Sequence, residues 1–479
     1  MLNVYIKNIY TDRIKRDNFI FFIIIFMLGY IMVAEYEFFS DDVHWLSQEM
    51  YKNPITWMMN GAKNYQPRLV SDFLASLLHT NLVVWKVFNA LCLAISVYLT
   101  ANISISNKKC KNEDINYLRL FVAGGLFFIY PNVLSMGYYW YAGSLSYSIP
   151  YAFMLIATMP FIKAMRGNFD NVYFSGISIW KTILLFFISA AACYTEQKAA
   201  FIIVFGFIAI TFCLIRKIKI SKSLYVLYGW IFIHSALFLI WNELFSLRRE
   251  WEKYKWYPNF DSISTVGKIF QSVNYTNFHF MSLSLLFLVA SILICYVLLK
   301  KYSDIKKYLG FIPLIYLLNT FLPFEMIFSH NSGNPYSHDP SLIWRNDLFS
   351  DFYKIASPSN FSGDIFPAVL ALFVIFVFGI TLIYIFDDNT EKILAIVFYG
   401  ASLSLGYVLG FSSTIFASGQ RIFYVPDLLF LILFGMIANY FLKISSKNIK
   451  DVIMFIFFIV SVLAAVRICY LFFLNNKFY

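Results

Sequence analysis

The stretch "NFIFFIIIFMLGYIMVA", Asn18 to Ala34, contains no charged residue and is long enough to cross a bilayer as one helix. Equally apolar stretches follow it along a chain of 479 residues, of which 60% are hydrophobic and 14% are charged. So few charged residues cannot cover a water-soluble globule of this size. The sequence therefore predicts an integral membrane protein. Because no small-residue cleavage site follows Ala34, we expect an uncleaved first helix rather than a signal peptide.

The apolar segments define the expected architecture. A window of about 20 residues finds about thirteen candidate spans, within a range of about eleven to fourteen. The predicted fold class is therefore all-α, a polytopic membrane protein, with residues 1–479 forming a single membrane domain. Three longer loops separate the spans at residues 35–78, 246–278 and 329–365. In the first, Leu69, Phe73, Leu77 and Leu78 recur at helical spacing, which predicts an amphipathic helix along the membrane interface.

Lysine and arginine placement predicts the topology. Short basic connections, such as Lys108 to Lys111 and Arg216 to Lys222, follow an even number of predicted spans. Such connections stay on the cytoplasmic side, so we expect a cytoplasmic N-terminus and external odd-numbered loops. Ser246 to Phe278 departs from the rule, since it is external by count yet holds several basic residues. The net charge of +11 is thus assigned to orientation and lipid headgroups rather than to nucleic acid.

The first external loop carries the most acidic stretch near a span. "EYEFFSDDVHW", Glu35 to Trp45, places Asp41 and Asp42 just beyond the first apolar run. Ser40 could cap a helix whose positive end the aspartates stabilise, or one aspartate could act as a catalytic base. Both interpretations stay open. Later in the loop, Arg68 is suited either to lipid headgroups or to a phosphate group, because a guanidinium offers two parallel donors.

Three further external segments hold candidate binding residues. Trp140 and Tyr141, in "WYAGSLSYSIP", either anchor helices at the interface or stack on a sugar ring. Glu196 and Lys198 lie in "CYTEQKAAF", a polar break so short that its charges must stay near the bilayer boundary, either as a plain turn or as part of a site. Arg421, in "FASGQRIFYVPD", makes a similar case between two late spans.

Together these residues favour one reaction class. If a sugar is held on a lipid phosphate, a carboxylate can deprotonate an acceptor hydroxyl while cations stabilise the leaving phosphate. The chain has no Gly-rich phosphate loop, so no nucleotide site is expected. Nor do the six cysteines show metal-ligand spacing. We expect no obligatory cofactor, although a divalent metal is compatible with the chemistry.

The layout resembles the GT-C membrane glycosyltransferases. More narrowly, "EYEFFSDDVHWLSQEMY", "YQPRLVSDF", "YWYAGSLSYSIPY" and "YTEQKAAF" are similar to the phage-encoded serotype-converting glucosyltransferases of enteric bacteria. The resemblance implies transfer of glucose, with inversion, from undecaprenyl phosphate to a sugar of the lipopolysaccharide O-antigen. It also implies a periplasmic site in the inner membrane, and a lipid flippase and a glucosyl-lipid synthase as functional partners. The resemblance assigns the acidic-pair role to Asp41 and Asp42. The roles of Arg68, Glu196, Lys198 and Arg421 rest on the charge argument.

Two alternatives belong to other functional classes. An O-antigen polymerase or ligase shares the spans, external loops and lipid-linked sugars, and would centre on a late loop such as "SHDPSLIWRNDLF" with Arg345. A lipid or polysaccharide transporter predicts charges near the bilayer midplane and often an internal repeat. The chain shows no clear repeat, and most of its polar residues cluster at segment ends.

Overall fold

The fold is described from a computed structural model. It describes residues 13–38, 53–64, 68–105, 112–167, 179–245, 248–256, 260–321, 365–414 and 418–478. Throughout these ranges the regular structure is helical and no strand occurs, as the sequence predicts. The helices divide into two compact units, the first formed by Met1–Trp251 with Gln420–Tyr479 and the second by Glu252–Gly419.

The first unit carries the candidate residues. Its elements are α2 (Arg13–Val33), α5 (Pro54–Asn64), α6 (Leu69–Leu78), α7 (Leu82–Ser104), α8 (Asn112–Leu126), α9 (Pro131–Leu134), η1 (Ser135–Tyr139), α10 (Tyr141–Ser146), α11 (Ser148–Met165), α12 (Ile179–Ala192), α13 (Glu196–Ile215), α14 (Lys222–Phe245), α15 (Arg248–Trp256), η8 (Gly419–Phe423), α23 (Tyr424–Ile444) and α24 (Lys447–Phe478). Two of them, α15 and η8, reach across the boundary between the units.

The second unit has fewer long helices. It contains η2 (Phe260–Ser262), α16 (Thr265–Phe278), η3 (His279–Leu283), α17 (Leu285–Lys301), η4 (Ile305–Tyr308), α18 (Phe311–Phe321), α21 (Ile365–Ile385), α22 (Asn389–Tyr407) and η7 (Val408–Phe411). The cap residues explain where two of these helices begin. Ser264 accepts from the Gly267 backbone N–H at 3.1 Å before α16, and Asp388 accepts from Thr390 at 2.8 Å before α22.

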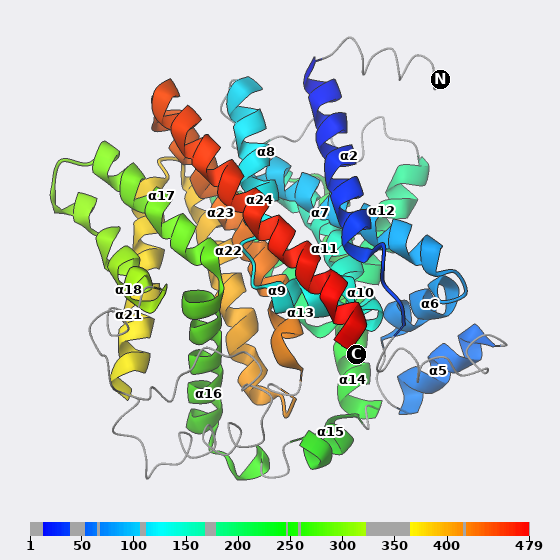
Figure 1. The fold of residues 1–479 in the computed structure, drawn as a ribbon. Coiled ribbons are helices and arrows are strands. Elements are labelled where there is room, and N and C mark those ends of the chain that lie inside the picture. Colours follow the sequence, from blue (N-terminus) through cyan, green and yellow to red (C-terminus); the bar gives the residue numbers. More distant parts are fainter. Residues whose placement is uncertain are drawn as a thin grey trace. The chain divides into compact units, whose positions relative to one another are not determined.

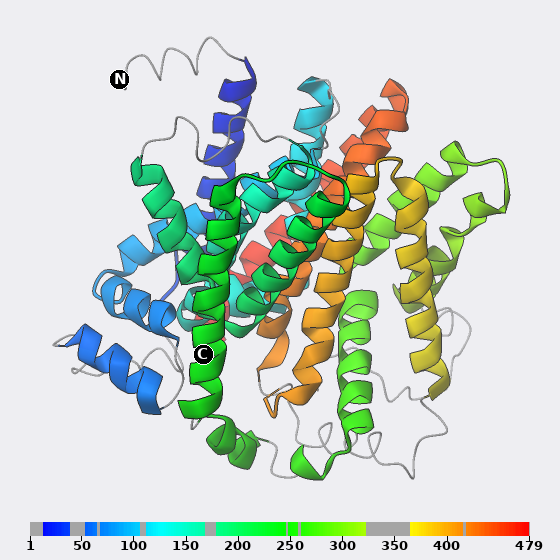
Figure 2. The ribbon, with the colours of Figure 1, turned by 180° about the vertical axis from the view of Figure 1, so that it is seen from behind.

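Helix α23 forms the centre of the first unit. Apart from Asp427 and Asn439 it is apolar on every side from Tyr424 to Leu442, and this stretch is almost entirely buried, as such a helix must be. It packs against α7 and α8, and α24 crosses α8 on the side seen in Figure 1. Close approach depends on Gly125 of α8, where a Cβ atom would lie 2.7 Å from Leu431 of α23. Seen from behind, α12 (teal) and α14 (green) lie next to each other, and their contact bears this out (Figure 2).

The described helices support membrane insertion. Eight helices within the described ranges are long and apolar enough to span a bilayer, or ten if each bent pair is one span. The chain turns by 88° between α8 and α9, and by 71° between η3 and α17. Sequence hydropathy cannot see such breaks, because an apolar run continues through each bend. The described residues are therefore those of an all-helical membrane protein, and the count of thirteen and the single domain stay predictions.

The first loop contains the helix that its periodicity predicts. Helix α6 covers Leu69–Leu78, and its exposed side carries the large apolar residues Phe73 and Leu77. Ser71, Asp72 and Ser76 face inward and are buried. A helix on the surface of a water-soluble protein exposes its polar side and buries its apolar side. Helix α6 does the reverse, so its exposed apolar side is suited to contact with lipid. The buried side connects α6 to the rest of the unit, since Ser71 donates to the Leu145 carbonyl at 2.9 Å.

Candidate functional site

A short segment with no charged residue, Trp140 to Ser146, lies at the centre of the candidate site. The π-helical turn η1 connects α9 to this segment. Helix α10 covers most of the segment and is followed by α11. The Trp85 indole donates to the Ser144 hydroxyl at 2.9 Å, and the Asn89 amide donates to the Tyr138 carbonyl at 2.8 Å. Helix α7 thus fixes the segment from one side. Trp85 and Asn89 are hydrogen-bond donors within an apolar span, and this is the sequence signal that could have predicted the contact with α7.

Tyr141 fastens the same segment to the first loop. Its ring is 2% exposed, and its hydroxyl donates to the Ala75 carbonyl of α6 at 2.8 Å. Its backbone N–H donates to the Tyr36 hydroxyl at 3.1 Å. The Phe38 ring packs edge-on to Tyr141, with 5.2 Å between centroids. These contacts give Tyr141 a role in positioning the segment, and its stacking on a sugar stays a prediction.

Trp140 points to a different partner. The Arg421 guanidinium carbon lies 5.2 Å from the centroid of its ring, within the range of a cation–π contact. Arg421 comes from η8, far along the sequence, immediately before α23. The Trp140 indole N–H is buried and has no hydrogen-bond partner among the described residues. A buried donor without a partner is costly, so this atom is suited to receive an acceptor from a ligand.

The first turn of α13 joins the remaining candidates. Glu196 lies with its carboxylate 3.8 Å from the guanidinium of Arg68, the N-cap residue of α6. Gln197 donates from its amide to the Ile422 carbonyl of η8 at 2.9 Å. Lys198 is 1% exposed, donates to the Ser146 carbonyl at 2.5 Å, and lies 4.8 Å from the Tyr147 ring centroid. One helical turn thus contacts α6, α10 and η8 together.

Sequence reasoning missed several members of this cluster. Thr195 precedes α13, yet its side chain makes no capping hydrogen bond, and its buried hydroxyl has no partner among the described residues. The Arg68 Nε and the Gln197 Oε1 are also buried without hydrogen bonds. The carbonyls of Ser146 and Ile422 are backbone groups, which no side-chain motif marks. The one indication is the helix break at Tyr147, between α10 and α11, which lets the Ser146 carbonyl accept a hydrogen bond from a side chain.

The cluster favours anions. Arg68 and Arg421 contribute two positive charges and Glu196 one negative charge, so these three side chains sum to +1, and Lys198 adds a buried amine that donates hydrogen bonds. The N-terminus of α13 adds the positive end of its helix dipole at the same place. Two guanidinium groups, a buried lysine amine and unpaired N–H and O–H donors form an environment suited to a phosphate with neighbouring hydroxyls.

The acidic pair lies outside the described residues, as does Arg345. The described chain leads up to the pair as far as Phe38, whose ring stacks on His79 at 4.5 Å between centroids with an interplanar angle of 8°. His79 in turn lies edge-on to Tyr141 at 5.9 Å. Asp41 follows Phe38 by three residues. Within the described ranges, no group of three or more His, Cys, Asp or Glu side chains could hold a metal ion.

Comparisons with known proteins add no relative. No protein-family model, no curated protein and no solved structure matches this chain. The candidate site therefore rests on the chain's own residues. The structure brings Arg68, Glu196 and Lys198 together around one turn of α13, and Trp140 and Arg421 around η8, which α13 contacts through Gln197.

Proposed function

We propose that this protein is a GT-C-type membrane glycosyltransferase that moves glucose from undecaprenyl phosphate to a sugar of the O-antigen repeat, at the periplasmic face of the bacterial inner membrane. The observation that carries the proposal is the cluster at the start of α13. There, Arg68, Lys198 and Arg421 surround unpaired buried donors. A polyprenyl-phosphate sugar offers what this site lacks, namely a phosphate for the cations and hydroxyls for the unpaired groups.

The proposed reaction divides the work between two groups of residues. The carboxylate of Asp41 or Asp42 takes the proton of the acceptor hydroxyl, and the hydroxyl oxygen bonds to the glucose C1. The bond from C1 to the phosphate oxygen breaks, and the lipid phosphate leaves with the electron pair. Arg68 and Arg421 are placed to stabilise the negative charge that develops on that phosphate. Attack from the opposite face inverts the configuration at C1.

The chain supplies a path between these two groups. At most about 11 Å separates the Cα atoms of Phe38 and Asp41, because each peptide unit spans about 3.8 Å. Phe38 contacts Tyr141, the neighbour of Trp140. Chain length alone therefore allows the pair to reach the Trp140 segment. A flippase that delivers the charged lipid and a synthase that makes it complete the proposed sequence of reactions.

A transfer assay tests the proposal. Membranes containing the protein receive radiolabelled undecaprenyl-phosphate glucose and O-antigen acceptor, and the label in the polysaccharide is measured. We expect label in the acceptor with wild type and its loss with Arg421→Gln at equal protein levels. An unlabelled acceptor whose chain length grows would instead support the polymerase. Movement of intact donor lipid across the bilayer without transfer would support the transporter.

A further inference from the structure

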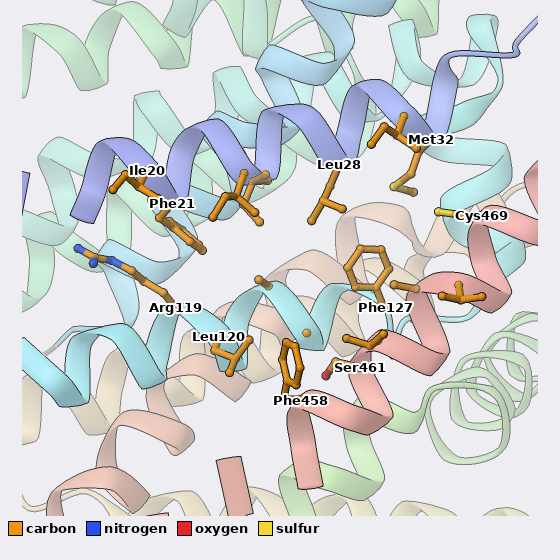
Figure 3. A pocket seen from close by; sticks show the side chains of 18 of the residues that line it. Ile20, Phe21, Leu28, Met32, Arg119, Leu120, Phe127, Phe458, Ser461 and Cys469 are labelled. Carbon is orange, nitrogen blue, oxygen red and sulfur yellow. The ribbon is translucent and has the colours of Figure 1, made fainter. Parts of the chain in front are cut away.

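A groove lies between α2, α8 and α24, and one of its ends reaches Tyr139, the neighbour of Trp140. Its volume is about 1200 Å³, and all of its walls belong to the first unit. Apolar side chains line most of its length, among them Phe21, Leu28, Leu120, Phe127 and Phe458 (Figure 3). On a membrane protein such a concave apolar surface meets lipid chains rather than water.

One end of the groove carries a buried charge. Arg119 of α8 is 7% exposed and lines the groove, and Figure 3 shows it opposite the end marked by Met32 and Cys469. Its guanidinium donates to the side-chain oxygens of Asn116, at 2.5 Å, and Asn18. It also lies 5.9 Å from the Phe21 ring centroid. No described carboxylate forms an ion pair with it.

The neighbouring charges leave this end positive. Arg16 lines the groove beside Arg119, and Asp17 lies 3.8 Å from Arg16 rather than in ion-pair contact with Arg119. Two guanidinium groups and one carboxylate sum to +1. Asp17 lines the same end and offsets part of this charge, and the positive charge that remains is costly in an apolar setting unless an anion completes the site. The groove thus supplies hydrocarbon contacts along its length and needs a negative group at one end.

We propose that the groove binds an anionic phospholipid, with its phosphate at Arg119 and Arg16 and an acyl chain along Phe21, Leu120 and Phe458. The length fits this assignment. From Arg16 to Val33, α2 rises about 26 Å, close to the thickness of the hydrocarbon core. An acyl chain covers half of that thickness, so one lipid fills the half next to Arg119. Lys15, next to Arg16 in the first turns of α2, adds to the positive character that attracts anionic lipids.

Native mass spectrometry of the purified full chain tests the site. Phosphatidylglycerol and phosphatidylcholine are added at equal concentrations, and the fraction of protein that carries one lipid is measured. We expect wild type to prefer phosphatidylglycerol about tenfold or more, as a charge-assisted hydrogen bond would give. Arg119→Gln should abolish the preference. Arg216→Gln removes an exposed arginine away from the groove and should retain it.

A second variant tests the groove without touching the charge. Ala123 lines the groove, so Ala123→Phe should displace the lipid chain and reduce binding of both lipids about tenfold. Ala464, a half-buried alanine of α24 outside the groove lining, provides the matched Ala464→Phe control, which should bind as wild type does. This comparison stands even where Arg119→Gln fails to fold.

Three results would overturn the proposal. The first is equal retention of the two phospholipids by wild type. The second is unchanged lipid binding in Ala123→Phe. The third is displacement of phosphatidylglycerol by millimolar inorganic phosphate, which would show an ion site in place of a lipid site. The readout involves no sugar transfer, so loss of the proposed enzymatic function would leave this lipid site standing.

Discussion

The guanidinium of Arg68 lies 3.8 Å from the carboxylate of Glu196, which links the first loop to the first turn of α13. Both side chains are partly exposed, at 23% and 43%, so the pair contributes little to stability. Its value lies in position. The contact holds the Arg68 guanidinium near Lys198 and Thr195. A phosphate that binds there can replace the Glu196 carboxylate as the partner of Arg68.

We predict that replacing this arginine separates function from stability. Arg68→Gln should change the free energy of unfolding by less than about 1 kcal/mol, because partly exposed ion pairs are worth little. Transfer should fall about tenfold or more, the loss expected when a charged hydrogen-bond donor to a phosphate is removed. The glucosyl-transfer assay and thermal unfolding in detergent measure the two effects. Lys63→Gln, an exposed cation in the same loop, is the control; equal losses in both variants would contradict a specific role.

The buried lysine should respond differently to two substitutions. Lys198 donates to the Ser146 carbonyl, so Lys198→Met leaves that carbonyl without its donor and should cost about 1–3 kcal/mol of stability. Lys198→Arg keeps a charge but must fit a larger planar group into a space that is 1% exposed. We expect both to abolish transfer, with Lys198→Met still folded. Lys219→Met, at an exposed position, serves as the control in the same unfolding and transfer measurements. Full activity of the methionine variant would rule out a role in phosphate binding.

Packing around Gly137 gives a prediction about the turn that delivers Trp140. A Cβ atom at Gly137 would collide with the ring of Tyr424, the first residue of α23. Gly137→Ala should therefore destabilise the protein by about 1–3 kcal/mol, the usual cost of overpacking a core. Gly229→Ala in α14 meets no atom within 4 Å and should be neutral or slightly stabilising. Melting temperatures of the two variants in one detergent make the comparison. A harmless Gly137→Ala would mean that η1 can move away from α23.

His79 should make stability depend on pH. Burial lowers the pKa of His79 from its ordinary value of 6.5, because the charged imidazole loses hydration. The folded state then binds fewer protons than the unfolded state below pH 6.5, so stability falls as the pH drops through that value. His79→Phe retains a ring against Phe38 and removes this contribution. The melting temperature should fall more from pH 7.5 to 5.5 in wild type than in the variant. Equal falls would show that other groups set the acid sensitivity.

The sequence predicted the parts of the fold that depend on local pattern. The apolar run at Asn18 to Ala34 predicts α2, and the spacing of Leu69 and Phe73 predicts α6, because hydrophobic periodicity is a local property. The bend after Leu126 could not be predicted, since the apolar run continues through it. Nor could the contacts of Lys198 with Ser146 and of Gln197 with Ile422, which join backbone carbonyls from distant segments. The candidate residues were identified by their charge and by their position at the ends of apolar segments. Only the tertiary structure shows that one turn of α13 links them.

The acidic pair provides the sharpest test of the proposed reaction. Phe38, three residues before Asp41, stacks on His79 and packs on Tyr141, the neighbour of Trp140. If one aspartate is the base, Asp41→Asn or Asp42→Asn should reduce transfer about a hundredfold or more, the usual contribution of general-base catalysis. Undecaprenyl-phosphate glucose should still bind, because an amide replaces the carboxylate without changing its size.

Glu37→Gln makes the same acid-to-amide change on the exposed residue next to Phe38, and it should leave both transfer and donor binding intact. Transfer and donor binding, measured side by side in membranes at equal protein levels, separate a lost base from a lost site. If both aspartate variants retain activity, neither aspartate is the base, and the pair serves only to stabilise the N-terminal end of a helix. Loss of donor binding together with transfer would assign the pair to holding the substrate, and the proton would then need another acceptor.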